Sequence, residues 1–138
     1  MYPEELVQPM KDELLSKGFS EFTTAEEVTN HFENNKGTTL VVVNSVCGCA
    51  AGACRPGVLF GLQHAEKKPD YLYTAFAGFD SEAVAKVREY LAPYPPSSPA
   101  IALFKDGDLV HYIERHHIEG RDAVIIGSHL KGVFEEKC

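Results

Sequence analysis

Two hydrophobic spacings alternate along this chain, and each predicts a different kind of element. Residues 40–43 form an unbroken aliphatic run inside the segment 38–45, which is typical of a strand covered on both faces. Other segments combine β-branched, aromatic and small apolar residues between turn signals, and these are 71–77, 100–104 and 109–114. The turn signal Lys-Asp-Gly-Asp lies between the last two, so we expect them to form a β-hairpin.

Apolar residues elsewhere recur at spacings of three and four, which is the pattern of amphipathic helices. The predicted helices cover residues 3–17, 24–34, 50–66, 81–91 and 121–134. Thr24 and Glu27 have the spacing of a capping box at the start of the second helix. Asp80 or Ser81 can cap the fourth helix.

Several residues inside these helices disfavour helical backbone. Pro9 predicts a break or kink in the first helix, and Pro56 predicts a kink in the third. The alternative for the third helix is that it begins after Pro56 and that residues 50–55 form a loop. Gly127 and Gly132 weaken the last helix.

The order helix, helix, strand, helix, strand, helix, strand, strand, helix predicts an α/β fold with a mixed central sheet of about four strands flanked by helices. With 138 residues the chain is long enough to bury the core of one domain. We therefore expect a single domain over residues 1–138, in which residues 1–36 are a helical N-terminal extension packed on the remainder.

The chain is acidic, with 20 Asp and Glu residues, 13 Lys and Arg residues and a formal net charge of −7. That charge argues against nucleic acid or an anionic membrane as the main partner. No apolar run approaches transmembrane length, and residues 1–6 lack the features of a signal peptide. We therefore expect a cytoplasmic protein, and in that reducing compartment its four cysteines are expected to be catalytic or metal-binding before structural.

Cys47, Gly48 and Cys49 lie where a predicted strand gives way to a predicted helix. Free backbone N–H groups and the positive end of the helix dipole favour an anion at such a junction. The thiolate is the anionic and reactive form of cysteine. No Asp or Glu lies between Glu33 and Glu66, so no acidic neighbour in the sequence opposes a thiolate there.

A disulfide between Cys47 and Cys49 would be tight. The Cα atoms of residues i and i+2 are roughly 5.5 to 7 Å apart, whereas disulfides use roughly 4.4 to 6.8 Å. Gly48 has no Cβ and permits the backbone adjustment that such a bridge needs. A strained, exposed bridge is easily reduced and belongs to the labile or catalytic class. The alternative is that the two cysteines are unrelated buried thiols.

The sequence Gly-Thr-Thr-Leu-Val-Val-Val-Asn-Ser-Val-Cys-Gly-Cys-Ala-Ala-Gly at residues 37–52 resembles the signature of the bacilliredoxins, which are small thioredoxin-like proteins with a Cys-Gly-Cys motif. The resemblance covers nearly the whole chain through the segments 23–28, 54–56, 76–80, 88–90, 96–99 and 115–120. Cys54 departs from the family pattern, in which that position is usually not cysteine.

The resemblance implies a thioredoxin-like fold and thiol–disulfide oxidoreductase activity. The implied reaction removes the small thiol bacillithiol from protein mixed disulfides, and the alternative is general disulfide reductase or isomerase activity. By analogy with thioredoxins, Cys47 attacks, and Cys49 resolves the adduct or tunes Cys47. The Ser98–Pro99 bond is expected to be cis and to face the cysteines, so that Gly48, Ser98 and Pro99 bind substrate. Stiffening of the loop is the other role open to Pro99.

The resemblance also implies the partners, which are client proteins carrying mixed disulfides, a low-molecular-weight thiol and a recycling reductase. We expect no nucleic acid and no membrane among them. We expect no tightly bound cofactor and no metal site, because bacillithiol enters as a co-substrate. A binding module is the alternative of another class, in which Cys47 and Cys49 hold Cu(I) or zinc, soft metals that suit thiolates. The spacing of structural zinc ligands is missing from the chain.

The remaining candidate residues have simpler interpretations. Cys54 is expected to be a buried packing residue, with a resolving role as the alternative. Cys138 is expected to be an accessory or incidental thiol on a mobile end, with a third redox role as the alternative. His116 and His117 are expected to be exposed in a turn, because no third metal ligand has an obvious spacing.

Overall fold

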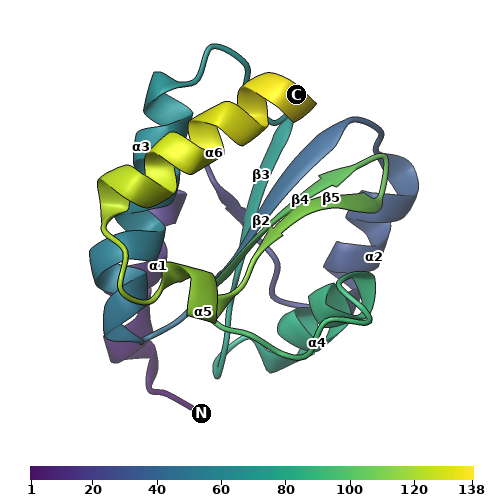
Figure 1. Ribbon diagram of the computed structural model, residues 1–138. Coiled ribbons are helices and arrows are strands. Elements are labelled where there is room, and N and C mark those ends of the chain that lie inside the picture. The colour runs from purple at the N-terminus through teal and green to yellow at the C-terminus, as the bar shows by residue number, and fades with distance from the viewer.

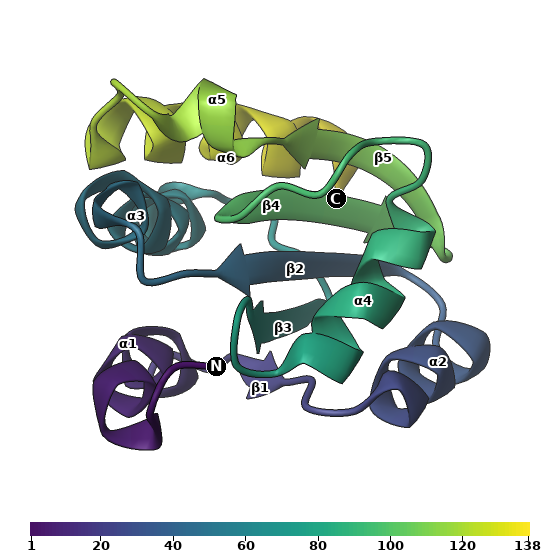
Figure 2. The same ribbon diagram turned by 90° about the horizontal axis from the view of Figure 1, so that it is seen from below.

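The computed structural model describes residues 1–138 as a five-stranded sheet with helices on both faces (Figure 1 and Figure 2). The strands are β1 (Ser20–Glu21), β2 (Thr38–Asn44), β3 (Tyr71–Phe76), β4 (Ala100–Lys105) and β5 (Asp108–Ile113). They lie in the order β1-β3-β2-β4-β5. β1, β3 and β2 are parallel, and β4 and β5 run antiparallel, so the sheet is mixed as predicted. This arrangement agrees with the thioredoxin-like fold.

Six α-helices and one π-helical turn connect and cover the strands. They are α1 (Glu4–Leu15), α2 (Ala25–Asn34), the π turn η1 (Ala50–Cys54), α3 (Arg55–His64), α4 (Ser81–Tyr90), α5 (Arg115–Ile118) and α6 (Ala123–Lys137). α1, α3 and α6 cover one face of the sheet, and α2 and α4 cover the other (Figure 1). None of these helices combines the length and the hydropathy needed to cross a membrane.

β2 is the central strand, and all of its residues are buried. Leu40 and Val42 point into the core under α1, α3 and α6, while Val41 and Val43 point into the core under α2 and α4. Successive side chains of a strand face opposite sides, so a strand between two helical layers must be apolar at every position. This explains the unbroken aliphatic run in the sequence.

Two short elements were not predicted. β1 adds a fifth strand and lies within residues 1–36, so that segment is not purely helical. α5 occupies the place where His116 and His117 were expected in a turn. Neither element is long enough to show a repeating hydrophobic pattern, because β1 has 2 residues and α5 has 4.

α1 is continuous through Pro9, although the sequence predicted a break or kink. Pro9 removes one helical hydrogen bond, to the carbonyl of Glu5 one turn earlier. Both residues are exposed, so water can bond to that carbonyl instead. The helix therefore tolerates the proline close to its N-terminal end.

Lys11 is a buried charge on α1 that the sequence analysis missed. Its Nζ lies 3.0 Å from both Glu21 Oε1 and Asp80 Oδ2. Burial lowers the pKa of Lys11, but hydrogen bonds and charge interactions with Glu21 and Asp80 outweigh burial, and the pKa is raised. Asp80 was predicted to cap α4, and it stands at the N-cap position, but its carboxylate bonds Lys11 rather than a helical N–H.

The predicted helix after the cysteines is present from Ala50 but ends at His64 rather than at residue 66. Its first turn is π-helical, with a hydrogen bond from the Arg55 N–H to the Ala50 carbonyl. Pro56 then falls in the first turn of α3, where a missing N–H is tolerated. The loop alternative for this segment is therefore wrong.

α6 begins after its N-cap Asp122, which accepts a hydrogen bond of 2.9 Å from the Ile125 N–H, and it runs past the predicted end to Lys137. Gly127 was expected only to weaken this helix, but it also lies where α6 packs against α3. A Cβ at that position would lie 2.5 Å from Cδ1 of Phe60 on α3. The glycine therefore permits the close approach of α6 and α3.

Candidate functional site

Cys47 and Cys49 lie in the segment that joins the end of β2 to η1. Both are free, both are partly exposed, and their Sγ atoms are 2.8 Å apart, within hydrogen-bond range for thiols. The N–H of Cys47 donates to Oγ of Ser45 at 2.9 Å. Gly48 between the cysteines is exposed and has no heavy atom near the place of a Cβ. The predicted pair is therefore an accessible dithiol in which one sulfur can bond to the other.

The surroundings shift the two thiols in opposite directions. The pKa of Cys47 is lowered, chiefly by the hydrogen bond from the Cys49 thiol and also by the backbone N–H groups of Cys49 and Ala50 and the charge of Arg115. The pKa of Cys49 is raised to about 11, first by burial and then by its interaction with Cys47. When the pair loses one proton, Cys47 is therefore the sulfur that becomes the thiolate, and Cys49 keeps its proton and donates to it.

A buried arginine holds the strand end beneath the cysteines. Nη1 of Arg55 donates to Asn44 Oδ1 at 2.9 Å and to the Ser45 carbonyl at 3.0 Å. Its Nε lies 3.0 Å from Glu13 Oε1, an ion pair without the alignment of a hydrogen bond. Asn44 also donates to the Met10 carbonyl. The guanidinium therefore links β2, α3 and α1 at the point where the chain turns toward Cys47.

The structure brings Ser98 and Cys47 to the same hollow. Ala100 pairs with Val43 in the sheet, so the residues just before β4 lie beside the segment that follows β2. Ser98 and Cys47 both line a hollow of about 370 Å³. The Ser98–Pro99 bond is cis, and Pro99 is buried behind Ser98.

Comparison with known proteins gives a consistent family. The model of the "Disulphide isomerase" family matches residues 2–138. A bacilliredoxin of Cytophaga hutchinsonii is 62% identical over 136 residues, which cover 99% of each chain. Bacilliredoxins of Bacillus cereus and Halalkalibacterium halodurans are 53% and 52% identical over 99% of this chain and 95% and 94% of theirs. This chain belongs to the bacilliredoxin family. Both descriptions are those of thiol–disulfide oxidoreductases, which is the chemistry that a paired thiolate and thiol can perform.

Two cysteines of this bacilliredoxin-family chain lie apart from the reactive pair. Cys54 is fully buried in the core, and burial raises its pKa to about 12, in agreement with a packing role. Cys138 is not on a frayed end, because its N–H bonds to the Phe134 carbonyl and its side chain is partly buried near Thr38. Thr38 begins β2 and Cys47 follows the end of that strand, so roughly 20 Å separates the two thiols.

His116 and His117 are exposed, as predicted, but they lie in α5 and have a neighbour that the sequence analysis did not identify. Ligand atoms of Glu114, His116 and His117 lie within 4.8 Å of one another. Backbone bonds tie Glu114 to His117, since the His117 N–H donates to the Glu114 carbonyl at 2.9 Å and the Glu114 N–H donates to His117 Nδ1 at 3.1 Å. The second bond occupies one ring nitrogen of His117.

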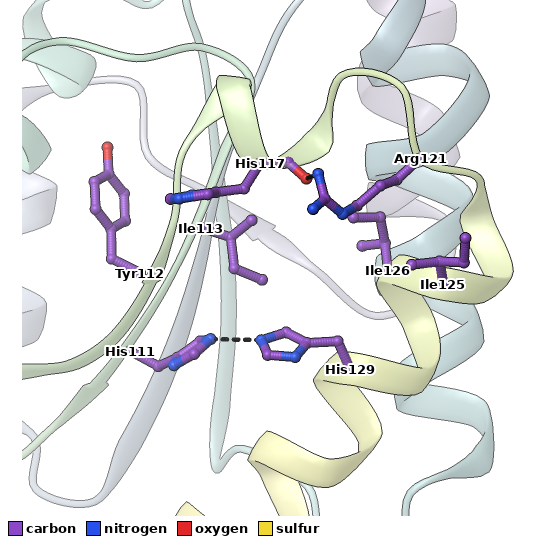
Figure 3. A pocket seen from close by; sticks show the side chains of 8 residues that line it. All are labelled: His111, Tyr112, Ile113, His117, Arg121, Ile125, Ile126 and His129. Atoms are coloured by element: carbon purple, nitrogen blue, oxygen red, sulfur yellow. Dashed lines mark hydrogen bonds between the residues drawn. The ribbon is translucent and has the colours of Figure 1, made fainter.

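A separate cavity of about 370 Å³ lies between β5 and α6 (Figure 3). Nε2 of His111 and Nε2 of His129 are 2.9 Å apart there, so one ring donates to the other. Burial, followed by the charge of His129, lowers the pKa of His111. No cysteine lines this cavity. The sequence analysis missed it because its residues come from different elements that only the fold brings together.

Proposed function

We propose that this protein removes bacillithiol from S-bacillithiolated client proteins through Cys47 and Cys49. The observation that carries the proposal is the 2.8 Å contact between two sulfurs whose pKa values are shifted apart. Such a pair provides one sulfur that ionises more readily and can attack, and a second thiol that stays protonated and can resolve the adduct. The similarity to bacilliredoxins supports bacillithiol as the thiol, and the net charge of −7 makes nucleic acid and anionic membranes poor partners.

In the first step, the Cys47 thiolate attacks the bacillithiol sulfur of the mixed disulfide. The client sulfur leaves as a thiolate and takes a proton from solvent. A new disulfide then joins Cys47 to bacillithiol, and the client is reduced. The N–H groups of Cys49 and Ala50 stabilise the attacking thiolate, and Ser98 lies at the wall of the hollow where the client backbone would run.

Two routes resolve the adduct. Cys49 can lose its proton and attack Cys47, which releases bacillithiol and forms the tight Cys47–Cys49 disulfide. Alternatively, a second bacillithiol attacks the bound bacillithiol sulfur, which releases oxidised bacillithiol and restores the Cys47 thiolate. In the adduct Cys47 carries no thiolate charge, so burial is the main cause that still raises the pKa of Cys49 and slows the first route. A reductase that accepts the oxidised product completes the cycle, which we place in the cytoplasm.

The "Disulphide isomerase" description of the matching family favours a second candidate function. In that reaction Cys47 attacks a disulfide within a client and releases it after rearrangement. The metal-binding alternative has less support, because neither cysteine belongs to a group of three closely spaced ligand atoms. A metal at the pair would need its other ligands from a second molecule.

The first experiment uses a client protein carrying one bacillithiol mixed disulfide. Wild type, C47S and C49S are each mixed with it, and all species are followed by intact mass. We expect C49S to strip the client and to keep one bacillithiol adduct on Cys47, since Cys49 is missing and no free bacillithiol is added to resolve it. C47S should leave the client unchanged.

Other results would count against the proposal. If neither substitution alters the reaction, or if the adduct maps to Cys54 or Cys138, then Cys47 is not the nucleophile. If the wild type reduces or rearranges client disulfides but leaves bacillithiolated clients untouched, the isomerase function replaces the proposed one.

A further inference from the structure

The hollow beside Cys47 has the opposite charge to the protein as a whole. Arg88 and Arg115 line it together with Cys47 and Ser98, and no Asp or Glu does. Arg88, Ser98 and Arg115 also line an adjoining hollow of about 570 Å³. A chain with a net charge of −7 thus places two guanidinium groups beside its reactive thiol. The combined space is in the range of small-molecule sites.

Arg88 has no partner within the protein. It extends from α4, and its side chain makes no hydrogen bond and no ion pair, although its Nε is buried. Buried donors in native proteins are nearly always satisfied, so the guanidinium of Arg88 is available to a partner that the chain does not supply. A guanidinium offers a planar fork of donors that matches a carboxylate.

Arg115 supplies the second cation from α5, on the other side of the hollow. Its Nε lies 3.2 Å from Glu119 Oε1, and its terminal nitrogens make no hydrogen bond. Glu114, the other acidic group of the adjoining hollow, has its carboxylate 3.7 Å from His116 Nε2. Each carboxylate of that hollow therefore has a neighbour within the protein, while the side chain of Arg88 has none.

We propose that Arg88 and Arg115 form an anion subsite that binds a carboxylate at the far end of the small thiol while its sulfur meets Cys47. This rests on the proposed function and specifies its substrate class as small thiols that carry carboxylates. Bacillithiol belongs to this class, because a malyl group lies beyond its cysteinyl-glucosamine unit. A thiol without an anionic end would lose these contacts but would present the same disulfide to Cys47.

Arg88 allows a clean test, because the groups that lower the pKa of Cys47 include Arg115 but not Arg88. The substrate is a peptide without acidic side chains that carries bacillithiol in a mixed disulfide. A matched control peptide carries bacillithiol whose malyl carboxylates are converted to methyl esters. The ratio of kcat/KM for the free acid to kcat/KM for the ester reports recognition of the carboxylates, independent of the reactivity of Cys47.

We expect the wild type to prefer the free acid by about tenfold or more, the range of a charge-assisted hydrogen bond. R88Q should lower that ratio by about tenfold, and R88K should restore part of it, because lysine keeps the charge but loses the fork. K86Q removes the same charge from the same helix outside the hollow and should keep the wild-type ratio.

Three results would overturn the subsite. One is a wild-type ratio near one, and another is a loss of rate in R88Q that is equal for both substrates, which indicates a structural role. The third is that R88Q does not change the preference for the malyl carboxylates but slows the reaction of a peptide that carries a neutral thiol and a Glu beside its cysteine. That result would assign the site to the client.

The proposed function and the subsite fail in different ways. If the wild type removes the esterified and the free-acid thiol equally fast, the proposed function stands and the subsite is wrong. If it removes neither, the function is wrong, and binding is then measured without chemistry by adding S-methylbacillithiol and following the Nε–H resonance of Arg88. A shift of that resonance, absent with the methyl ester, supports the subsite, and no shift overturns it.

Discussion

At one end of β2 the chain continues into Cys47, and at the other end Thr38 lies beside Cys138. Both thiols are partly exposed. The pKa of Cys47 is nevertheless lowered, by the Cys49 thiol, two backbone N–H groups and Arg115. The pKa of Cys138 is raised, first by burial and then by the charge of Asp70, although a hydrogen bond with Thr38 opposes the rise.

The difference lies in what each end of a strand presents to a sulfur. After the end of β2 a helical turn begins, and the backbone N–H groups of Cys49 and Ala50 help to lower the pKa of Cys47. Before the start of β2 the Asp70 carboxylate acts on Cys138 and raises its pKa, and no helix begins there. Exposure alone therefore does not make a cysteine reactive, because the groups that face the sulfur decide how much thiolate is present.

Removing each thiol gives the largest contrast between the two ends. C47S should lower de-bacillithiolation by at least about a thousandfold, since it removes the nucleophile. C138S should leave the rate within about twofold, because its thiol is remote and held protonated by its raised pKa. The measurement is kcat/KM with one bacillithiolated client. A comparable loss in C138S would mean that the two ends act together, for example across two molecules.

The reactive end should also depend on the buried Arg55. R55M leaves the Ser45 carbonyl and one bond of Asn44 unsatisfied, so we expect a loss of about 2–4 kcal/mol in the free energy of unfolding. Urea unfolding measures this loss, and Tm should fall by roughly 5–15 °C. R121M, at an exposed arginine, should cost no more than about 0.5 kcal/mol. Equal effects of the two substitutions would show that Arg55 does not hold the strand end.

Removing the groups that lower the pKa of Cys47 should raise that pKa again, one substitution at a time. C49A removes the thiol hydrogen bond and R115Q removes a nearby charge, so each should move the pH midpoint of Cys47 alkylation upward, C49A further than R115Q. At pH 7 the alkylation rate by iodoacetamide, mapped by peptide mass, should fall severalfold in each. K105Q, near Cys138, should leave the Cys47 profile unchanged. An unchanged midpoint in C49A would contradict the assignment of the sulfur–sulfur contact as its main cause.

The smallest expected effect comes from His31 of α2, whose ring contacts the start of β2. Its Nε2 lies 2.8 Å from Thr39 Oγ1, and burial lowers its pKa. The unfolded chain therefore binds more protons, so the free energy of unfolding should decrease as the pH falls below about 6.5 toward the folded pKa. H31Q should flatten this slope in urea unfolding between about pH 5 and 7. H116Q, at an exposed histidine, should keep it.

The sequence by itself determined the long elements and the identity of the reactive pair. The aliphatic run of β2, the capping box of Thr24 and Glu27, and the junction that holds Cys47 and Cys49 were all readable, because each depends on residues close together in the chain. Local spacing carries that information directly. The position of the antiparallel β4–β5 hairpin followed from its turn sequence in the same way.

Only the tertiary structure decided which distant groups meet the thiolate. Arg88 and Arg115 come from different helices, and nothing in their spacing shows that they share a hollow with Cys47. Ser98 was expected there only through the family resemblance. The buried ion pairs of Lys11 also join distant segments. A charge can be recognised as buried or unpaired only when its neighbours in space are known, since desolvation and Coulomb interactions depend on distance through the fold and not along the chain.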